Sequence, residues 1–413
     1  MDALYRSVWR WHLVAGLLVL PFLAWLAVTG ALYLYKPEIE RAVYADWLRV
    51  EVRPALPLAV LTARVAASTG GRVTQVAKPA AAESWRMTIA MPDGERRTAF
   101  VDPGDGRVLG TTRPGGVMGL VKELHSLAIT GPIGNAAIEI AAGWTIVLVL
   151  TGIWLWASKP RFGVRGPVRG RRFWRDLHAS TGVVAGAVIL FLAVTGMPWS
   201  GVWGKGLQTL VAARGWGRPP SPTPVGHGEH GGAATLPWSM QRAGVPVGHG
   251  GDIGPDRALA AARARGIGDA WSLTLPASPG APYLVSAAIV RTDDARAIHV
   301  DAGTGRVLQD ARYRDFGGGA QAIEWGIAAH QGQQYGEVNR LVMLAGCLAI
   351  LLLVVSAPVM WVKRRPRGLG LPPGRSGRGL AALMAGSGLL FPLTGLTMLA
   401  ALLVERIARR HAG

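Results

Sequence analysis

The chain has 413 residues, 50% of them hydrophobic, and a formal net charge of +19, with a mean hydropathy of +0.27. It is too apolar for an ordinary soluble protein and too polar for a chain made only of membrane spans, so we expect membrane helices that carry sizeable water-exposed domains. Cys347 is the only cysteine, which excludes internal disulfides, thiolate-held iron–sulfur clusters and haem attachment through a Cys-x-x-Cys-His motif.

Apolar runs lie near residues 12–34, 136–156, 179–199, 341–361 and 380–403. Each is long enough to cross a hydrocarbon core of roughly 30 Å. The first run follows Arg6 and Arg10, as a signal peptide would, but its near-copy at 177–199 lies in mid-chain, where no signal peptide stands. We therefore expect the first run to remain as a helix.

The apolar runs predict transmembrane helices at 1–35, 121–158, 176–201 and 326–362, and a fifth apolar helix at 379–404, which contains Pro392. The loops at 159–175 and 363–378 are rich in Lys and Arg. Short loops of this kind stay in the cytoplasm, so we expect a cytoplasmic N-terminus and place the segments 36–120 and 202–325 outside. The positive charge is then a topology signal with some contact to anionic lipid, and nucleic-acid binding is not expected.

The two outside segments each predict a small α+β domain. Stretches such as SWRMTIAM (84–91) and YLVSAAIV (283–290) alternate as strands do, and Asp-x-Gly-x-Gly turns precede "RVL" strands at 107–109 and 306–308. Residues 56–69 and 254–266 have the pattern of amphipathic helices. Residues 217–254 are rich in Gly, Pro and His and predict an insertion in the second domain.

The chain is a duplicated unit of span, outside domain and span. His12 and His178 open the first and third spans. Each is followed by a glycine four residues later and by a Thr-Gly pair that begins seventeen residues later, at Thr29 and Thr195. His125 and His330 open the second and fourth spans in the same way. The matched residues that follow these two histidines are Gly131 and Gly336, then Thr151-Gly152 and Ser356-Ala357, then Trp156 and Trp361.

Topology pairs the four histidines by depth. The first and third spans run outward, so His12 and His178 are predicted near the cytoplasmic face, while His125 and His330 are predicted near the outer face. Ionisable residues at the ends of spans can simply face headgroups, but four at matched positions favour a function. Two imidazoles from opposing helices suit the axial positions of a haem iron. Zinc would normally require three or four protein ligands, and no Cys, Asp or Glu completes such a set.

A macrocycle also needs space beside its ligands. Gly16 and Gly182 lie one helical turn after His12 and His178, on the same helix face, where a larger side chain would obstruct the ring. Close helix packing is the alternative role for these glycines, and both roles are compatible.

The series of motifs resembles the PepSY-associated transmembrane family, whose members include bacterial inner-membrane reductases of ferric siderophores. The resemblance covers roughly residues 5–365 and rests on RWHLVAGLL…AVTG, ELHSL, DLHASTGVV…AVTG, AAHQGQQYG and the PepSY-like VDPGDGRVLG and VDAGTGRVLQ. It implies that His12, His125, His178 and His330 are haem-iron ligands holding two haem b groups, and that the protein lies in a bacterial inner membrane with its large domains in the periplasm.

The resemblance and the paired histidines together predict an electron-transfer oxidoreductase. Electrons would enter at the His12–His178 haem and leave from the His125–His330 haem to an external acceptor. The resemblance implies a ferric siderophore or another ferric chelate, with cupric ion or a small oxidant as alternatives. The cytoplasmic loops have no nicotinamide or flavin motif, so the donor would be a quinol or a separate cytoplasmic reductase. The alternative is a non-enzymatic, membrane-tethered PepSY binding or regulatory protein whose histidines are structural.

Three further features carry open alternatives. His227, His230 and His249 could bind metal weakly, although a solvated loop is the favoured interpretation. Arg340 could neutralise a haem propionate or anchor the span at the interface. Glu139 could relay protons, pair with Arg340 or have a structural role within its span.

Overall fold

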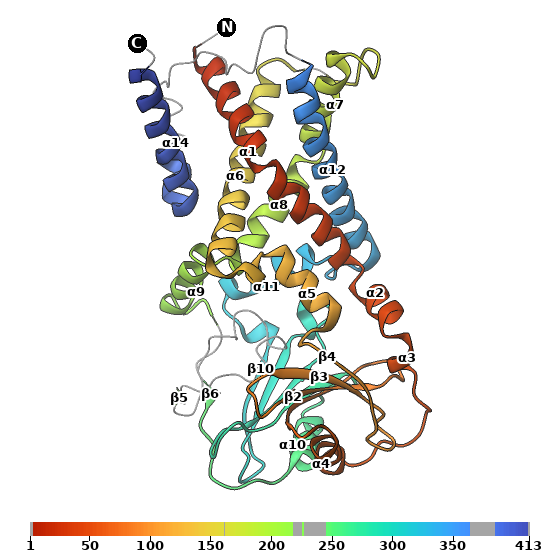
Figure 1. Cartoon of the computed structure of the whole chain (residues 1–413). Helices are drawn as coiled ribbons and strands as arrows, with labels where there is room; N and C mark the ends of the chain where they lie inside the picture. Colours follow the sequence, from red (N-terminus) through yellow and green to blue (C-terminus); the bar gives the residue numbers. More distant parts are fainter. Residues whose placement is uncertain (1–2, 161, 218–224, 227–244, 364–384, 412–413) are drawn as a thin grey trace. The chain divides into compact units, whose positions relative to one another are not determined.

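The computed structural model describes residues 3–160, 162–217, 225–226, 245–363 and 385–411. They form two compact units, one helical and one built on a β-sheet, and each unit is assembled from separate stretches of the chain (Figure 1). The helical unit contains the chain up to Leu34, the stretch Val121–Thr209 and the chain from Ala329. The sheet unit contains Tyr35–Leu120 and Leu210–Ala328.

The helical unit is a bundle of long apolar helices. Its principal helices are α1 (Ala3–Leu34), α6 (Gly131–Ala157), α7 (Arg171–Val184), α8 (Gly186–Gly196) and α12 (Gly336–Val362). Among the described residues, α1, α6 (with the short turn before it) and α12 are each long and apolar enough to cross a membrane, and α7 with α8 pass the same test only as a bent pair. Helix α1 packs against both α6 and α12, and α12 also packs against α7.

The third predicted span is not one straight helix. Helices α7 and α8 meet at an angle of 59°, with Ala185 between them. Gly182 and Gly186 lie on either side of this break, and glycine weakens a helix interior. A Cβ on Gly186 would lie 3.4 Å from Ile153 Cδ1, so α8 packs closely on α6. The third transmembrane helix, predicted at 176–201, is therefore bent into two helices, which pass the test for a span only together.

His125 and His330 do not lie on the spanning helices, contrary to the sequence prediction. His125 is the last residue of α5 (Gly116–His125), and His330 is the last residue of α11 (Gly318–His330). The chain then turns before α6 and α12 begin. Gly131 and Gly336, the matched glycines, start these helices with φ of 77° and 62°, a conformation that residues with a side chain rarely adopt. The predicted helices at 121–158 and 326–362 are therefore each interrupted.

The fifth apolar run is also not one continuous helix. Helix α14 (Pro392–His411) begins at its proline, because proline fits the first turn of a helix and disrupts its interior. Trp144 Nε1 of α6 donates a 3.0 Å hydrogen bond to Thr397 Oγ1 of α14. Residues 379–384 of the predicted helix lie outside the described residues.

The sheet unit contains one eight-stranded antiparallel sheet, in the order β10-β9-β8-β7-β1-β2-β3-β4. Its strands are β1 (Arg72–Lys78), β2 (Trp85–Ala90), β3 (Arg96–Val101), β4 (Val108–Thr112), β7 (Trp271–Thr274), β8 (Tyr283–Ala287), β9 (Arg296–Val300) and β10 (Val307–Arg312). Each repeat supplies four strands, and β1 pairs with β7. The sequence predicted two separate α+β domains, whereas this pairing joins the two repeats into a single sheet.

Two helices cover one face of this sheet: α4 (Leu58–Thr69) and α10 (Pro255–Ala264). The core beneath them is completely buried and includes Leu61, Val76, Leu273 and Ile298. The carboxylate of Asp256, in the first turn of α10, accepts the Leu58 and Ala59 N–H groups at 2.7 and 3.0 Å. Because the first N–H groups of a helix have no partner within it, this contact caps α4 with a residue from the other repeat.

The Asp-x-Gly-x-Gly turns contain a buried aspartate in each repeat. The Asp102 carboxylate accepts from Arg53 at 2.9 Å, whereas the Asp301 carboxylate accepts from His249 Nδ1 at 2.6 Å and from the Gly303 and Thr304 N–H groups. Burial by itself would raise the pKa of Asp301, but these hydrogen bonds outweigh burial and hold the pKa well below its ordinary value.

Asp301→Asn is expected to lower the free energy of unfolding of the sheet unit by about 1–3 kcal/mol at pH 7, because buried N–H groups lose a charged acceptor. Because the pKa of Asp301 is lower in the folded state, its ionised carboxylate stabilises the folded state at pH values above the unfolded-state pKa of 3.8. This stabilisation is lost as the pH falls below 3.8. The wild-type advantage should therefore shrink below about pH 4. Denaturant unfolding of the full chain at several pH values measures this, with the exposed Asp293→Asn as the control. Equal effects of both substitutions would contradict the prediction.

Candidate functional site: two histidine pairs in the helical unit

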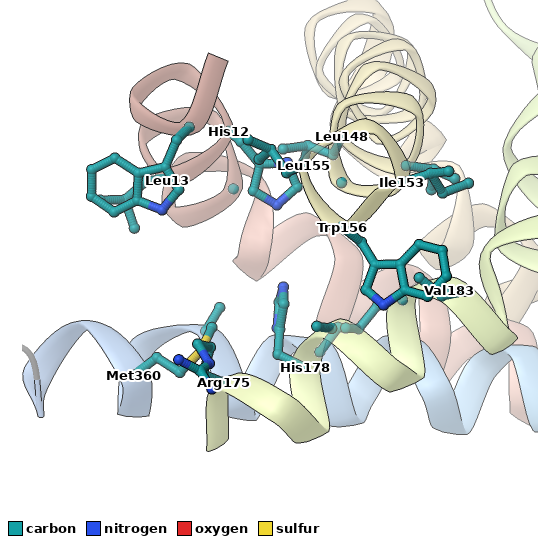
Figure 2. Close-up of a pocket in the computed structure, with 18 of the residues that line it drawn as sticks. His12, Leu13, Leu148, Ile153, Leu155, Trp156, Arg175, His178, Val183 and Met360 are labelled. Carbon is teal, nitrogen blue, oxygen red and sulfur yellow. The ribbon is translucent and has the colours of Figure 1, made fainter. Parts of the chain in front are cut away.

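The helical unit contains a cavity of about 440 Å³ lined by both His12 and His178. His12 lies on α1 and His178 lies on α7, and their imidazole rings point toward each other across the cavity (Figure 2). The matched tryptophans Trp156 and Trp361 also line it. The structure therefore brings together the two residues that the sequence assigned to one pair, in a space of the size typical of ligand sites.

The glycines that follow these histidines face the same cavity. A Cβ on Gly16 would meet only Leu148 Cδ2, at 3.9 Å, and a Cβ on Gly182 would meet only Leu353 Cδ2, at 3.9 Å. Both are ordinary van der Waals distances, so neither glycine is required for close helix packing. The absence of side chains here leaves the cavity open beside the two imidazoles.

Cationic side chains lie at the same cavity. Lys159, Arg171 and Arg175 are among its lining residues. The Arg175 guanidinium hydrogen-bonds the buried Asp176 carboxylate at 2.6 Å, and Arg165 contacts the same carboxylate at 3.3 Å. Asp176 lines the cavity as well, so apolar walls are combined with three cationic side chains and one carboxylate, a net positive charge that suits an apolar ligand with acidic groups.

The second pair, His125 and His330, lies in the same helical unit, and an electrostatic interaction links the two residues. A Cβ on Gly30 would lie 3.4 Å from His125 Cε1, and a Cβ on Gly196 would lie 3.6 Å from His330 Cε1. Each ring is therefore packed against a glycine of a spanning helix.

Every one of the four imidazoles hydrogen-bonds a hydroxyl through Nδ1. The Nδ1–Oγ distances are 3.0 Å for His12 and Thr151, 2.9 Å for His178 and Ser356, 2.8 Å for His125 and Thr29, and 2.9 Å for His330 and Thr195. The pattern is reciprocal within each repeat. In the first repeat, His12 of α1 contacts Thr151 of α6, and Thr29 of α1 contacts His125, which precedes α6. In the second repeat, His178 of α7 contacts Ser356 of α12, and Thr195 of α8 contacts His330, which precedes α12.

Sequence reasoning missed these hydroxyl residues. Thr29, Thr151, Thr195 and Ser356 were visible as matched positions of the repeat, but they received no role. The signal was present in the spacing, because each hydroxyl residue recurs at a fixed distance from a histidine. What was lacking was the pairing of helices, which only the fold supplies.

The remaining candidate residues have structural contacts. The Glu139 carboxylate accepts the Val202 and Trp203 N–H groups at 2.8 and 3.1 Å, so it caps helix α9 (Trp203–Ala213). Arg340 forms an ion pair with Glu337. His249 binds Asp301 through its ring, as described above, whereas His227 and His230 lie outside the described residues.

Within the part of the chain that the structure describes, no three His, Cys, Asp or Glu side chains converge as they would around a bare metal ion. The apolar helices define a helical membrane protein, and its helical unit contains all four of the matched histidines. The PepSY-associated TM region matches residues 9–364, and the chain belongs to this family. A comparison with curated proteins finds no match.

Gly16→Phe is expected to fill the cavity beside His12 and His178 without unfolding the helical unit, since the space next to Gly16 is open. Ligand uptake at this pair should be largely lost, because the phenyl ring occupies the space beside the two imidazoles, while the second pair is unaffected. The matched control is Leu18→Phe, because Leu18 is on the same helix and is 70% exposed. Haem titration of both variants measures the effect, and equal uptake by the two would contradict the role given to the cavity.

Proposed function

We propose that this protein is a transmembrane electron-transfer protein that holds a haem b at each histidine pair and reduces an acceptor outside the inner membrane. The observation that carries the proposal is the cavity lined by His12 and His178, whose rings face each other. A bound haem b supplies one-electron oxidation and reduction of its iron.

The residues present fit such a group. His12 and His178, which come from different helices, would hold the haem iron through their imidazoles. Gly16 and Gly182 leave room beside them, and Lys159, Arg171 and Arg175 offer partners for the acidic propionates.

The two pairs are separated along the bundle. Thr29, which contacts His125, lies seventeen residues after His12 on the same helix. At a rise of about 1.5 Å per residue, this separation is roughly 26 Å along α1, close to the thickness of a hydrocarbon core. In this proposal the two sites therefore serve opposite leaflets, with four spans, a cytoplasmic N-terminus and a periplasmic sheet unit.

The proposed route runs from the His12–His178 site to the His125–His330 site and then to the acceptor. A ferric chelate, such as a ferric siderophore, takes one electron per iron and becomes ferrous. Oxygen ligands hold the softer ferrous ion less tightly, so reduction favours release of the metal. A quinol donor would give two electrons and two protons and so reduce two ferric ions; a cytoplasmic reductase is the other donor class.

The test is the visible spectrum of the full-length protein, expressed with added haem and purified in detergent. We expect the reduced-minus-oxidised spectrum of low-spin haem b, and we expect addition of a ferric chelate to reoxidise the reduced protein. A colourless preparation would overturn the proposal and favour a membrane-tethered PepSY binding or regulatory protein. A coloured protein that the chelate does not reoxidise would reject the ferric acceptor.

A further inference from the structure

We infer that Thr29, Thr151, Thr195 and Ser356 are positioning residues that hold each histidine in the tautomer with the proton on Nδ1 and the free lone pair on Nε2. The inference rests on the proposed function in one respect, that Nε2 binds a haem iron. The tautomer itself follows from the hydrogen bonds.

Each threonine hydroxyl has one proton, and that proton is already committed. Thr29, Thr151 and Thr195 donate to the carbonyl four residues earlier in their own helix, at 2.6, 2.7 and 2.6 Å. Toward its histidine each threonine oxygen can therefore only accept, so Nδ1 of His12, His125 and His330 must carry the proton. Ser356 Oγ lies 3.2 Å from the Leu353 carbonyl oxygen and 2.9 Å from His178 Nδ1, and the matched place of Ser356 in the repeat assigns the same tautomer to His178. A neutral imidazole has a single N–H, which leaves Nε2 as the acceptor or ligand atom.

The residue after each threonine explains why the ring can reach the hydroxyl. Gly30, Gly152 and Gly196 follow the three threonines, and a Cβ on Gly152 would approach His12 Cε1 to 3.1 Å. Such a contact is tight enough to displace the ring. The Thr-Gly pair therefore combines an acceptor for Nδ1–H with a flat surface for the imidazole, and it fixes both the tautomer and the ring orientation.

A hydroxyl partner at all four histidines, with glycine after it at three of them, points to a single requirement. Proteins usually orient a metal-ligating histidine through a hydrogen bond from the ring nitrogen that does not bind the metal, which is Nδ1 here. A hydroxyl meets this requirement without adding a negative charge within the bundle, which a carboxylate would do. The four hydroxyl residues therefore leave the Nε2 lone pair free to bind iron before a haem enters the site.

Thr151 offers the sharpest variant, because Thr151→Val keeps the side-chain shape and removes the acceptor, whereas Thr151→Ser keeps the acceptor. Thr209→Val is the control, because Thr209 lies in the same unit, donates to the Lys205 carbonyl four residues earlier at 3.0 Å and does not line the cavity. In full-length protein, we expect Thr151→Val to weaken haem binding at the His12–His178 pair by about 10- to 100-fold. Thr151→Ser and Thr209→Val should bind like the wild type, and the electron paramagnetic resonance of this site should shift only in Thr151→Val.

Two results would overturn the inference: wild-type binding by Thr151→Val, or equal losses in Thr151→Val and Thr151→Ser. Nitrogen-15 NMR of histidine-labelled, haem-free full-length protein gives a readout that does not depend on haem. We expect a protonated Nδ1 and an unprotonated Nε2 at His12; the opposite tautomer would contradict the inference. If the wild type binds no haem, the proposed function fails, and the NMR result still decides the tautomer.

Discussion

His178→Ala is expected to halve the haem content of the purified protein, from two haems per chain to one. The substitution leaves His12 alone at the cavity, and a single imidazole supplies only one of the two axial ligands. His125 and His330 bond to hydroxyls elsewhere in the bundle, so their haem should be retained with an unchanged spectrum. Haem per chain, determined after size-exclusion chromatography, measures the effect.

His249→Ala is the control for a general effect of removing histidine. Its side chain is 75% exposed and bonds Asp301 in the sheet unit, so the protein should keep both haems. Loss of both haems in His178→Ala, with the bundle still folded, would contradict two independent sites. Retention of both haems would contradict the ligand role of His178.

His330→Ala is expected to lower reduction of an external ferric chelate by about two orders of magnitude or more, because loss of a ligand exceeds the effect of losing its hydrogen-bonded partner. The His12–His178 site should still become reduced, because its residues are unchanged. Stopped-flow spectra of vesicles, with reductant inside and chelate outside, separate these two events. His249→Ala again serves as the control.

Undiminished chelate reduction by His330→Ala would contradict the route through the second pair. Failure to reduce the first site would show instead that electrons enter elsewhere. The two outcomes can be told apart in one trace, because reduction of the protein and oxidation by the chelate occur in sequence.

Much of the candidate site could be predicted from the repeat. The matched spacing of His12 with His178, and of His125 with His330, identified both pairs before any fold was known. The reason is physical: repeated units adopt the same structure, so residues at the same position take equivalent places in the bundle. Gly131 and Gly336 were matched for the same reason, although their positive φ could not be read from the spacing.

Other features depend on contacts that the sequence does not specify. The break between α7 and α8 lies where Gly186 packs closely on α6, a contact between two spans. The pairing of β1 with β7 joins strands almost two hundred residues apart, and edge pairing of this range has no local signal. The hydroxyl partners required knowledge of which helices are neighbours, because Thr151 and His12 belong to different spans.

The central claim is that the two histidine pairs each hold a haem b. A pyridine haemochrome assay on the wild-type protein, expressed with ample haem and combined with amino-acid analysis for chain concentration, tests it most directly. Two haem b per chain is the predicted result, since each histidine pair would bind one iron. One haem per chain, or none, would contradict the account.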